Sequence, residues 1–432
     1  MIDARKTIRW VPFCIAFFCS GGALANEFKT KIGLDIEHTN NSGLVPKGLE
    51  LHDSEYRPAL GIDYTITLAN FESSLNYSAT RIDYAKNTFA DRTDVLGTGT
   101  FVWTILDRNL VWNFYQNRSR LKVDSLLGDN PANQTNRDVI QTGPRLSLNF
   151  GKNNTLSVNT SYVDSSFTNG ITNNSQQGQI GLEYQRTLDS QDSLRLTANA
   201  AEVRFDNPMF DYQSQRYGLT FESNPRNFQY AITVGQNSVD RNVGTSFSGA
   251  YLSFSVSANR GNSSWSFSGN RELTDSSVGT GVSQNTPGAQ LNNDSNLSNT
   301  DIVERIRSDI SFRTSLSNQR VTLALNLYYD DQDYQTLMQD REVYGFVTDI
   351  AYRSTRKLTL SYTFRGTRDT TFNTNTSAEE ESTQVNHRLQ GVYRFNPNFR
   401  WLLWLENDER NYQSLLRDYD QVAVGLTLEY QF

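Results

Sequence analysis

The chain has 432 residues, of which 37% are hydrophobic, 12% aromatic and 20% charged. Its 47 acidic residues outnumber its 40 basic ones, a balance that gives no support to nucleic-acid binding, which needs a basic patch or stripe. Beyond the N-terminal segment, no stretch approaches the ~20 continuous apolar residues that a membrane helix requires. The bulk numbers therefore argue against a nucleic-acid-binding protein and against a helical membrane protein.

The N-terminal segment has the three-part plan of a secretory signal peptide. Basic residues precede the apolar run VPFCIAFFCS, and the small-x-small sequence Ala-Leu-Ala follows at 23–25. This order predicts a signal peptide over residues 1–25 and a mature chain over 26–432. Both cysteines, Cys14 and Cys19, lie in the predicted signal peptide, so we expect no disulfide and no cysteine metal site in the mature chain.

The rest of the chain alternates between apolar and polar residues with a period of two, which is typical of β-strands. The first strand is predicted at 27–38 and the last at 417–432. Between them the strands come in pairs, predicted at 56–68/71–77, 95–105/110–114, 140–150/156–162, 178–188/194–200, 217–221/228–234, 252–258/265–269, 306–314/321–329, 344–352/358–364 and 385–395/401–405.

Short and long connections alternate along these strands. Within each pair the connection is turn-like, as in DRN, GKNN, DSQD and NPN, which are residues that tolerate tight turns. Between pairs the connections are longer and polar, as in HTNNSGLVPKGLELHD, SLLGDNPANQTN, DDQDYQTLMQD and residues 275–300. Nine short turns and ten long loops predict about twenty strands, with 18–20 as the range.

Strand length and loop asymmetry separate a membrane barrel from a soluble sandwich. The alternating runs are about ten to fifteen residues long, against about 5–6 in globular proteins, and a tilted strand needs ~9–11 residues to cross a bilayer. Short periplasmic turns and long outer loops are typical of outer-membrane barrels. We therefore expect an all-β protein, a closed antiparallel transmembrane β-barrel in the outer membrane of a Gram-negative bacterium.

The final strand, QVAVGLTLEYQF, carries apolar residues at alternate positions up to a terminal aromatic. Such a strand is the usual insertion signal of outer-membrane proteins, which predicts the barrel-assembly machinery as a partner. The residues predicted to form this signal are Val424, Leu426, Leu428, Tyr430 and Phe432. We expect the strand to close the barrel by pairing with residues 27–38, because a sheet in hydrocarbon must leave no open edge.

A loose family resemblance follows from VWNFYQNRSRLKVDSLLGDN, QTNRDVIQTGPRLSLNFG and the terminal LTLEYQF. With these stretches the chain resembles the outer-membrane β-barrels found with exosortase/PEP-CTERM protein-sorting and exopolysaccharide systems, a porin-like group. The resemblance implies a barrel that works beside exopolysaccharide export. That family has no established catalytic residues, so the resemblance implies none in this chain.

The face opposite the apolar one is expected to line the lumen, with hydroxyls and amides in the majority. Charge enters it mainly in the C-terminal half. The candidate lumen-lining residues are Arg305, Arg307, Asp309, Arg313, Asp349, Arg353, Lys357, Arg365, Arg388, Arg394, Trp404 and Glu406. Barrels of 16–18 strands already leave an aqueous channel, so we expect a passage for polar, sugar-like solutes or polysaccharide. The alternative is a structural or adhesion barrel that its loops plug.

Two groups of loop residues are assigned to the outer side. Residues 275–300 either fold inward as a constriction or remain an outer loop. The acidic runs Asp330, Asp331, Asp333 and Glu379–Glu381 are expected in solvated loops rather than in a metal site, and the alternative is a weak bridge to lipopolysaccharide through divalent ions.

An enzymatic role is not expected, because general acid–base catalysis needs a base within hydrogen-bond reach of its partner. The chain has three histidines. His38 and His52 bracket the first long loop, and His387 is expected in the outer aromatic belt. A barrel hydrolase is the least favoured alternative, and neither a cofactor nor a metal is predicted.

Overall fold

The computed structural model describes residues 25–275 and 301–432, apart from 108, 125–126, 169–172, 338, 374–377 and 414–416. In this part of the chain, twenty strands form one sheet. They are β1 (Ala25–Thr39), β2 (Asp53–Thr67), β3 (Phe71–Tyr84), β4 (Arg92–Leu106), β5 (Leu110–Lys122), β6 (Gln134–Phe150), β7 (Asn154–Phe167), β8 (Ser175–Thr187), β9 (Asp192–Phe205), β10 (Tyr212–Ser223), β11 (Phe228–Arg241), β12 (Phe247–Arg260), β13 (Ser263–Asp275), β14 (Ile302–Leu316), β15 (Val321–Tyr334), β16 (Gln339–Arg353), β17 (Leu358–Asn373), β18 (Ala378–Arg394), β19 (Phe399–Tyr412) and β20 (Tyr419–Gln431). Two 3₁₀ turns, η2 (Pro131–Asn133) and η3 (Pro208–Phe210), lie in connections.

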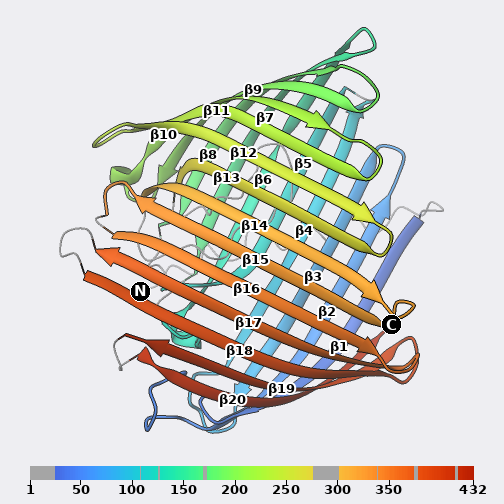
Figure 1. The fold of residues 1–432 in the computed structure, drawn as a ribbon, viewed down its shortest axis with the longest axis vertical. Helices are drawn as coiled ribbons and strands as arrows, with labels where there is room; N and C mark the ends of the chain where they lie inside the picture. Colours follow the sequence, from blue (N-terminus) through green and yellow to red (C-terminus); the bar gives the residue numbers. More distant parts are fainter. Residues whose placement is uncertain are drawn as a thin grey trace, which may run out of the picture.

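The sheet closes on itself into a barrel. Every strand runs antiparallel to its two neighbours, and β1 pairs with β20 from Lys31↔Gln431 to Thr39↔Ala423. The barrel and its tilted strands are visible in Figure 1. Closure pairs the backbone groups of the first and last strands, which an open sheet would leave unsatisfied in hydrocarbon. The predicted fold, the strand number of twenty and the pairing of the first strand with the last are confirmed.

All nine predicted hairpin pairs are also present, each with its short connection at the same end of the barrel. Two of these turns use a glycine in the left-handed region, Gly151 at φ +69° between β6 and β7 and Gly261 at φ +58° between β12 and β13. A residue with a side chain is strained at such angles. These two glycines thus fix where β6 and β12 end on this side.

On the long-loop side, the predicted strand ends were wrong. The acidic residues Asp330, Asp331 and Asp333 belong to β15, and Glu379–Glu381 belong to β18, although loops were expected there. Strands of 12–17 residues are longer than the ~9–11 that a bilayer needs. They continue into water, where polar residues on both faces do not interrupt backbone pairing.

The predicted signal peptide and the 275–300 loop fall almost wholly outside the described residues; only Ala25, the first residue of β1, and Asp275, the last residue of β13, are described. No described helix is long and apolar enough to cross a membrane.

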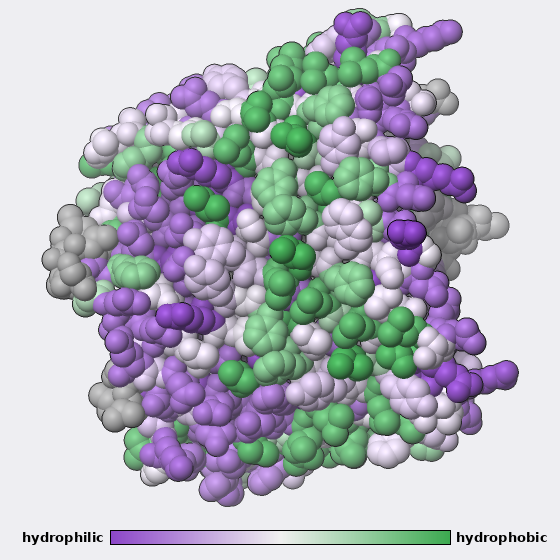
Figure 2. Space-filling model, in the orientation of Figure 1, coloured by the Kyte–Doolittle hydropathy of each residue, from purple (hydrophilic) through white to green (hydrophobic). Residues whose placement is uncertain are grey.

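The outer face of the barrel carries an apolar belt. Figure 2 shows apolar side chains gathered in a band between two polar ends of the molecule. Near the short turns this band contains exposed tryptophans, Trp103 and Trp112, which flank the β4–β5 turn. Aromatic residues are typical of both membrane–water interfaces of such barrels. A closed barrel with an apolar outer belt and a polar interior is an outer-membrane protein of a Gram-negative bacterium.

Candidate functional site in the barrel interior

The inner wall consists of the side chains on one face of the paired strands. Trp404 lies opposite Gly425, and Glu406 lies opposite Ala423, so these residues share a face. Their neighbours of opposite parity, Leu403 and Leu405, are 49% and 50% exposed on the outer surface. The apolar residues of β20 predicted to form the insertion signal lie on this same outer face, opposite in parity to Gly425.

All candidate lumen-lining residues except Lys357 lie in strands, with the parity of this inner face. They are Arg305, Arg307, Asp309 and Arg313 on β14, Asp349 and Arg353 on β16, Arg365 on β17, Arg388 and Arg394 on β18, and Trp404 and Glu406 on β19. Lys357 lies in the short turn between β16 and β17.

Near the long loops, several inner-wall charges are buried in ion pairs. Arg305 Nε donates to Asp330 Oδ1 at 2.7 Å, and both residues are buried. Arg341 Nη2 donates to Asp369 Oδ2 at 2.7 Å in the same manner. Removing one partner of a buried pair leaves an uncompensated charge, which costs ~3–5 kcal/mol. Each partner is therefore needed by the other, and these pairs are not exposed to a solute.

Trp404 is enclosed on both faces of its ring. The Arg388 guanidinium carbon lies 4.4 Å from the ring centre. Gly425 lies against the ring so closely that an added Cβ would be 2.3 Å from it. Arg388 Nη1 also donates to Glu406 Oε2 at 3.0 Å. The indole therefore positions Arg388 and offers no open face on which a sugar ring could stack.

A cavity of about 320 Å³ lies beside this tryptophan. On its far wall Arg57 contacts Asp35 at 3.1 Å and Glu37 at 2.7 Å. Its lining residues are Asp35, Glu37, Arg57, Arg388, Trp404, Glu406, Gln421, Ala423 and Thr427. Every charged group of this cavity has a partner of opposite sign, but three carboxylates share two guanidinium groups, so the cavity is polar with an acidic excess.

A second cavity, of about 340 Å³, lies on the wall formed by β5, β6 and β7. It is lined by Val111, Asn113, Tyr115, Gln141, Gly143, Pro144, Arg145, Ser147, Asn159, Thr160 and Ser161. Amides and hydroxyls supply both donors and acceptors, and Tyr115 adds an aromatic ring. This mixture suits a neutral, hydroxyl-rich solute such as a sugar.

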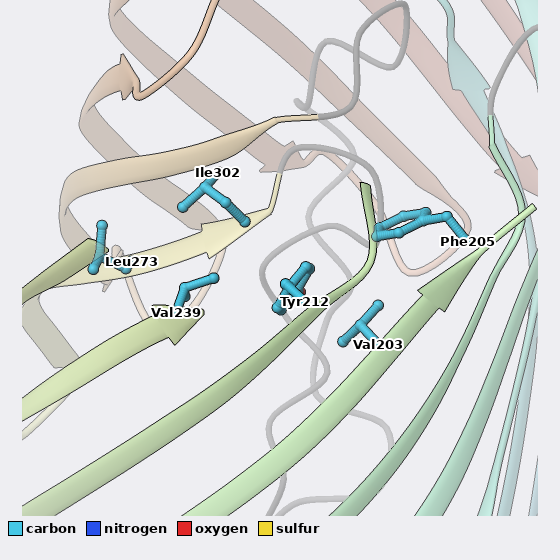
Figure 3. Packing of buried hydrophobic residues seen from close by; sticks show 6 residues of the cluster. All are labelled: Val203, Phe205, Tyr212, Val239, Leu273 and Ile302. Carbon is cyan, nitrogen blue, oxygen red and sulfur yellow. The ribbon is translucent and has the colours of Figure 1, made fainter. Parts of the chain in front are cut away.

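The inner face was expected to carry mostly hydroxyls and amides, and near the long loops of β9–β11 the structure differs from this expectation. Here a buried apolar cluster consists of Val203, Phe205, Tyr212, Val239, Leu273 and Ile302 (Figure 3). Tyr212 Oη donates to Asp275 Oδ2 at 2.5 Å, at the end of β13. Burying apolar area stabilises the fold by about 25 cal/mol per Å². This part of the interior is therefore a packed core and not a water-lined wall.

One connection that was expected to be a plain outer loop lies against the inner wall instead. The Leu127 carbonyl, in the connection between β5 and β6, accepts from Arg410 Nη1 of β19 at 3.0 Å. Asn130 Nδ2 of the same connection donates to the Gly43 carbonyl, between β1 and β2, at 2.9 Å. Arg410 is on the inner face and is 3% exposed. The described part of the β5–β6 connection thus extends over the lumen as an inward strap.

Exposure divides the inner wall into two halves. In the half near the long loops, inner residues such as Val139, Val239 and Arg341 are buried. In the half near the short turns, inner residues of β14–β18 such as Arg313 and Arg365 are exposed, whereas Ser157 and Glu183 on β7 and β8 are buried. Along β14–β18 the interior is therefore an open vestibule on the turn side that narrows towards the long loops.

His387 lies on the outer face, in an aromatic group. Its ring stacks on Phe364 with centres 4.7 Å apart, and its Nδ1 is 2.8 Å from the Tyr362 hydroxyl. Replacing His387 by Ala should lower the free energy of unfolding by about 1–2 kcal/mol, the sum of an aromatic pair and a hydrogen bond. Urea unfolding in lipid vesicles measures this change. A loss of a hydrolytic activity with unchanged stability would contradict a structural role.

Among the residues that the structure describes, no three His, Asp or Glu side chains are placed to hold a metal ion.

Neither a family model nor a curated protein matches the sequence. Solved outer-membrane proteins match the fold. A loop-deletion mutant of OmpT, an outer membrane protein of Vibrio cholerae, is 11% identical, with coverage of 95% of this chain and 100% of that chain and a TM-score of 0.39. The siderophore receptor PirA from Pseudomonas aeruginosa is 10% identical, with coverage of 94% and 80% and a TM-score of 0.49.

Proposed function

We propose that the protein forms a gated aqueous passage across the outer membrane for polar, sugar-like solutes. The observation that carries this proposal is the exposed polar vestibule on the turn side, with the Tyr115 cavity in its wall. A barrel of this size encloses more space than side chains alone fill. The buried half near the long loops supplies the gate, and the inward strap is part of it.

Polysaccharide is the proposed cargo. The amide- and hydroxyl-lined cavity on β5–β7 matches the hydrogen-bonding pattern of a sugar chain. The resemblance of the sequence to exosortase-associated barrels supports the same class of solute. Lipid and lipopolysaccharide are the proposed neighbours of the outer belt. The barrel-assembly machinery is the proposed partner of β20 during insertion.

Swelling of proteoliposomes in sugar solutions tests the passage directly. Vesicles that contain the folded barrel should swell in solutions of small sugars faster than protein-free vesicles. The rate should fall as the sugar becomes longer. Swelling no faster than in protein-free vesicles, with the barrel shown to be folded, would favour the second candidate, a structural or adhesion barrel. The packed loop half is the observation that favours that candidate.

The gate is tested by replacing Arg410 with Met. This change removes the hydrogen bond to the Leu127 carbonyl and the one to Ser382 Oγ at 3.1 Å. A hydrogen bond from a charged group contributes ~1.5–3 kcal/mol, so the strap should be released and the swelling rate should rise. The matched control makes the same replacement at Arg400, whose partner is Glu429 near the short turns. This variant should leave the swelling rate unchanged. A slower or equal rate in the Arg410 variant would contradict the gate.

A further inference from the structure

Four arginines of the turn-side vestibule form a basic wall. They are Arg313 on β14, Arg353 on β16, Arg365 on β17 and Arg394 on β18, and all four are exposed on the inner face. None of them makes a side-chain hydrogen bond or ion pair with any residue that the structure describes. This distinguishes them from the paired arginines near the long loops.

The sequence around the basic wall lacks acidic residues. No Asp or Glu occurs at 310–329, 350–368 or 388–405, which form the turn halves of three neighbouring hairpins. Arg320, Arg356 and Lys357 add further positive charge in the turns themselves. The charge on this side of the vestibule is therefore strongly positive, although the whole chain is acidic.

The nearby carboxylates compensate this charge only in part, because Asp349 is the one among them without an arginine partner in the part of the chain that the structure describes. Asp349 accepts a hydrogen bond from Thr363 Oγ1 at 2.6 Å. Glu406 pairs with Arg388 at 3.0 Å, and Glu429 pairs with Arg400 at 2.8 Å. The basic wall thus keeps its donors free for a ligand.

The cations of the basic wall are spread along the direction of the strands. The Arg394 amide donates to the Lys357 carbonyl at 2.9 Å, and Arg353 lies opposite Thr359, so these three cations meet at the turn end. Arg365 is six residues further along β17, which is about 20 Å of strand. The cations therefore extend from the mouth into the vestibule, towards Arg388.

The wall beyond β19 and β20 carries paired charge. On β1 and β2, Lys31 contacts Asp63 at 2.5 Å, and Lys29 contacts Glu27. Arg57 is held by Asp35, Glu37 and Glu55. An anion in the vestibule is therefore attracted to the β14–β18 side. Guanidinium groups suit carboxylates and phosphates, because their planar donors match these groups in a bidentate manner.

From this geometry we infer that the basic wall binds acidic saccharides, with carboxylate or phosphate groups, and makes the passage anion-selective. The inference deepens the proposed function and rests on it for transport; binding of the saccharide to the wall does not depend on transport. It names the class of solute that the vestibule accepts from the turn side.

Two proteins are compared with the unmodified barrel. The test variant replaces Arg313, Arg353, Arg365 and Arg394 with Gln, which keeps polarity and length. The matched control replaces Lys152, Arg186, Arg226 and Arg260 with Gln, which removes the same charge near the short turns of β6–β12. Heat-modifiable migration on gels shows that each protein is folded.

The first measurement is the reversal potential in planar bilayers under a KCl gradient. We expect chloride to be more permeant than potassium in the unmodified barrel and in the control. The test variant should lose this preference. Cation selectivity in the unmodified barrel, or equal shifts in both variants, would overturn the inference.

The second measurement is calorimetric binding of an oligogalacturonate, with a neutral maltooligosaccharide for comparison, to the barrel in micelles. The acidic oligomer should bind more tightly than the neutral one, and more weakly as salt rises. Its affinity should fall about tenfold or more in the test variant, since one charge-assisted hydrogen bond is worth ~1.5–3 kcal/mol. Equal binding by the test variant would overturn the inference. A barrel that binds the acidic oligomer but never conducts would contradict the proposed transport, while the binding of acidic saccharides to the basic wall would be supported.

Discussion

A proline in place of Leu426 is expected to abolish the folded barrel. Leu426 lies in the middle of β20, opposite Ile36 of β1 on one side and Leu403 of β19 on the other. Proline has no N–H group and removes a ladder hydrogen bond. In hydrocarbon an unsatisfied backbone group costs several kcal/mol, and the lost bond lies in the strand that closes the barrel. A loss of this size approaches the ~5–15 kcal/mol that stabilises a whole protein domain.

Leu426→Val is the matched control, because it keeps the N–H group and an apolar outer side chain. The valine variant should still show the faster gel migration of an unheated folded barrel, whereas the proline variant should migrate as unfolded protein before and after heating. A proline variant with the migration of the folded barrel would show that β20 is not needed for closure.

An arginine introduced on the outer face should lower the free energy of unfolding far more than an arginine introduced at the next residue, which faces the interior. Ile310 is 46% exposed on the outside and lies opposite Phe267 and Leu327 in the apolar belt. An arginine on the lipid face near the bilayer midplane destabilises such barrels by about 2–4 kcal/mol. Ile310→Arg should therefore lower the free energy of unfolding by this amount in lipid vesicles, measured by urea titration.

Ser311→Arg provides the comparison, because Ser311 has the inner parity and its hydroxyl donates to Asn326 Oδ1 at 2.8 Å. The new guanidinium would lie in the vestibule, beside water. Its effect on stability should be small. Equal destabilisation by both substitutions would contradict the assignment of the two faces.

Much of the fold was predictable, because two local features of the sequence determine which face of a strand is outside and where a strand ends. Alternation along each strand separates lipid-facing residues such as Ile310 from inner ones such as Ser311. Turn residues such as Gly151 and Gly261 mark where strands end on one side. In a closed antiparallel barrel these signals are sufficient to fix strand number and face, since each strand pairs with its sequence neighbours and the last pairs with the first.

The interior near the long loops was not predictable in the same way. The contact of Arg410 with the Leu127 carbonyl joins residues 283 positions apart, and no local pattern indicates it. The apolar cluster around Val203 and Tyr212 has inner parity, which alternation alone assigns to water. Beyond the membrane the outer face no longer meets lipid, so parity stops predicting which side of a strand is packed.

Single-channel recording of the purified barrel in a planar bilayer tests the proposed passage most directly. The unmodified protein should open in discrete conductance steps, and the Arg410→Met variant should open more often, because its strap is no longer bound to β19. A folded barrel that stays silent in both forms would show that the interior is a plugged core, and would contradict the passage.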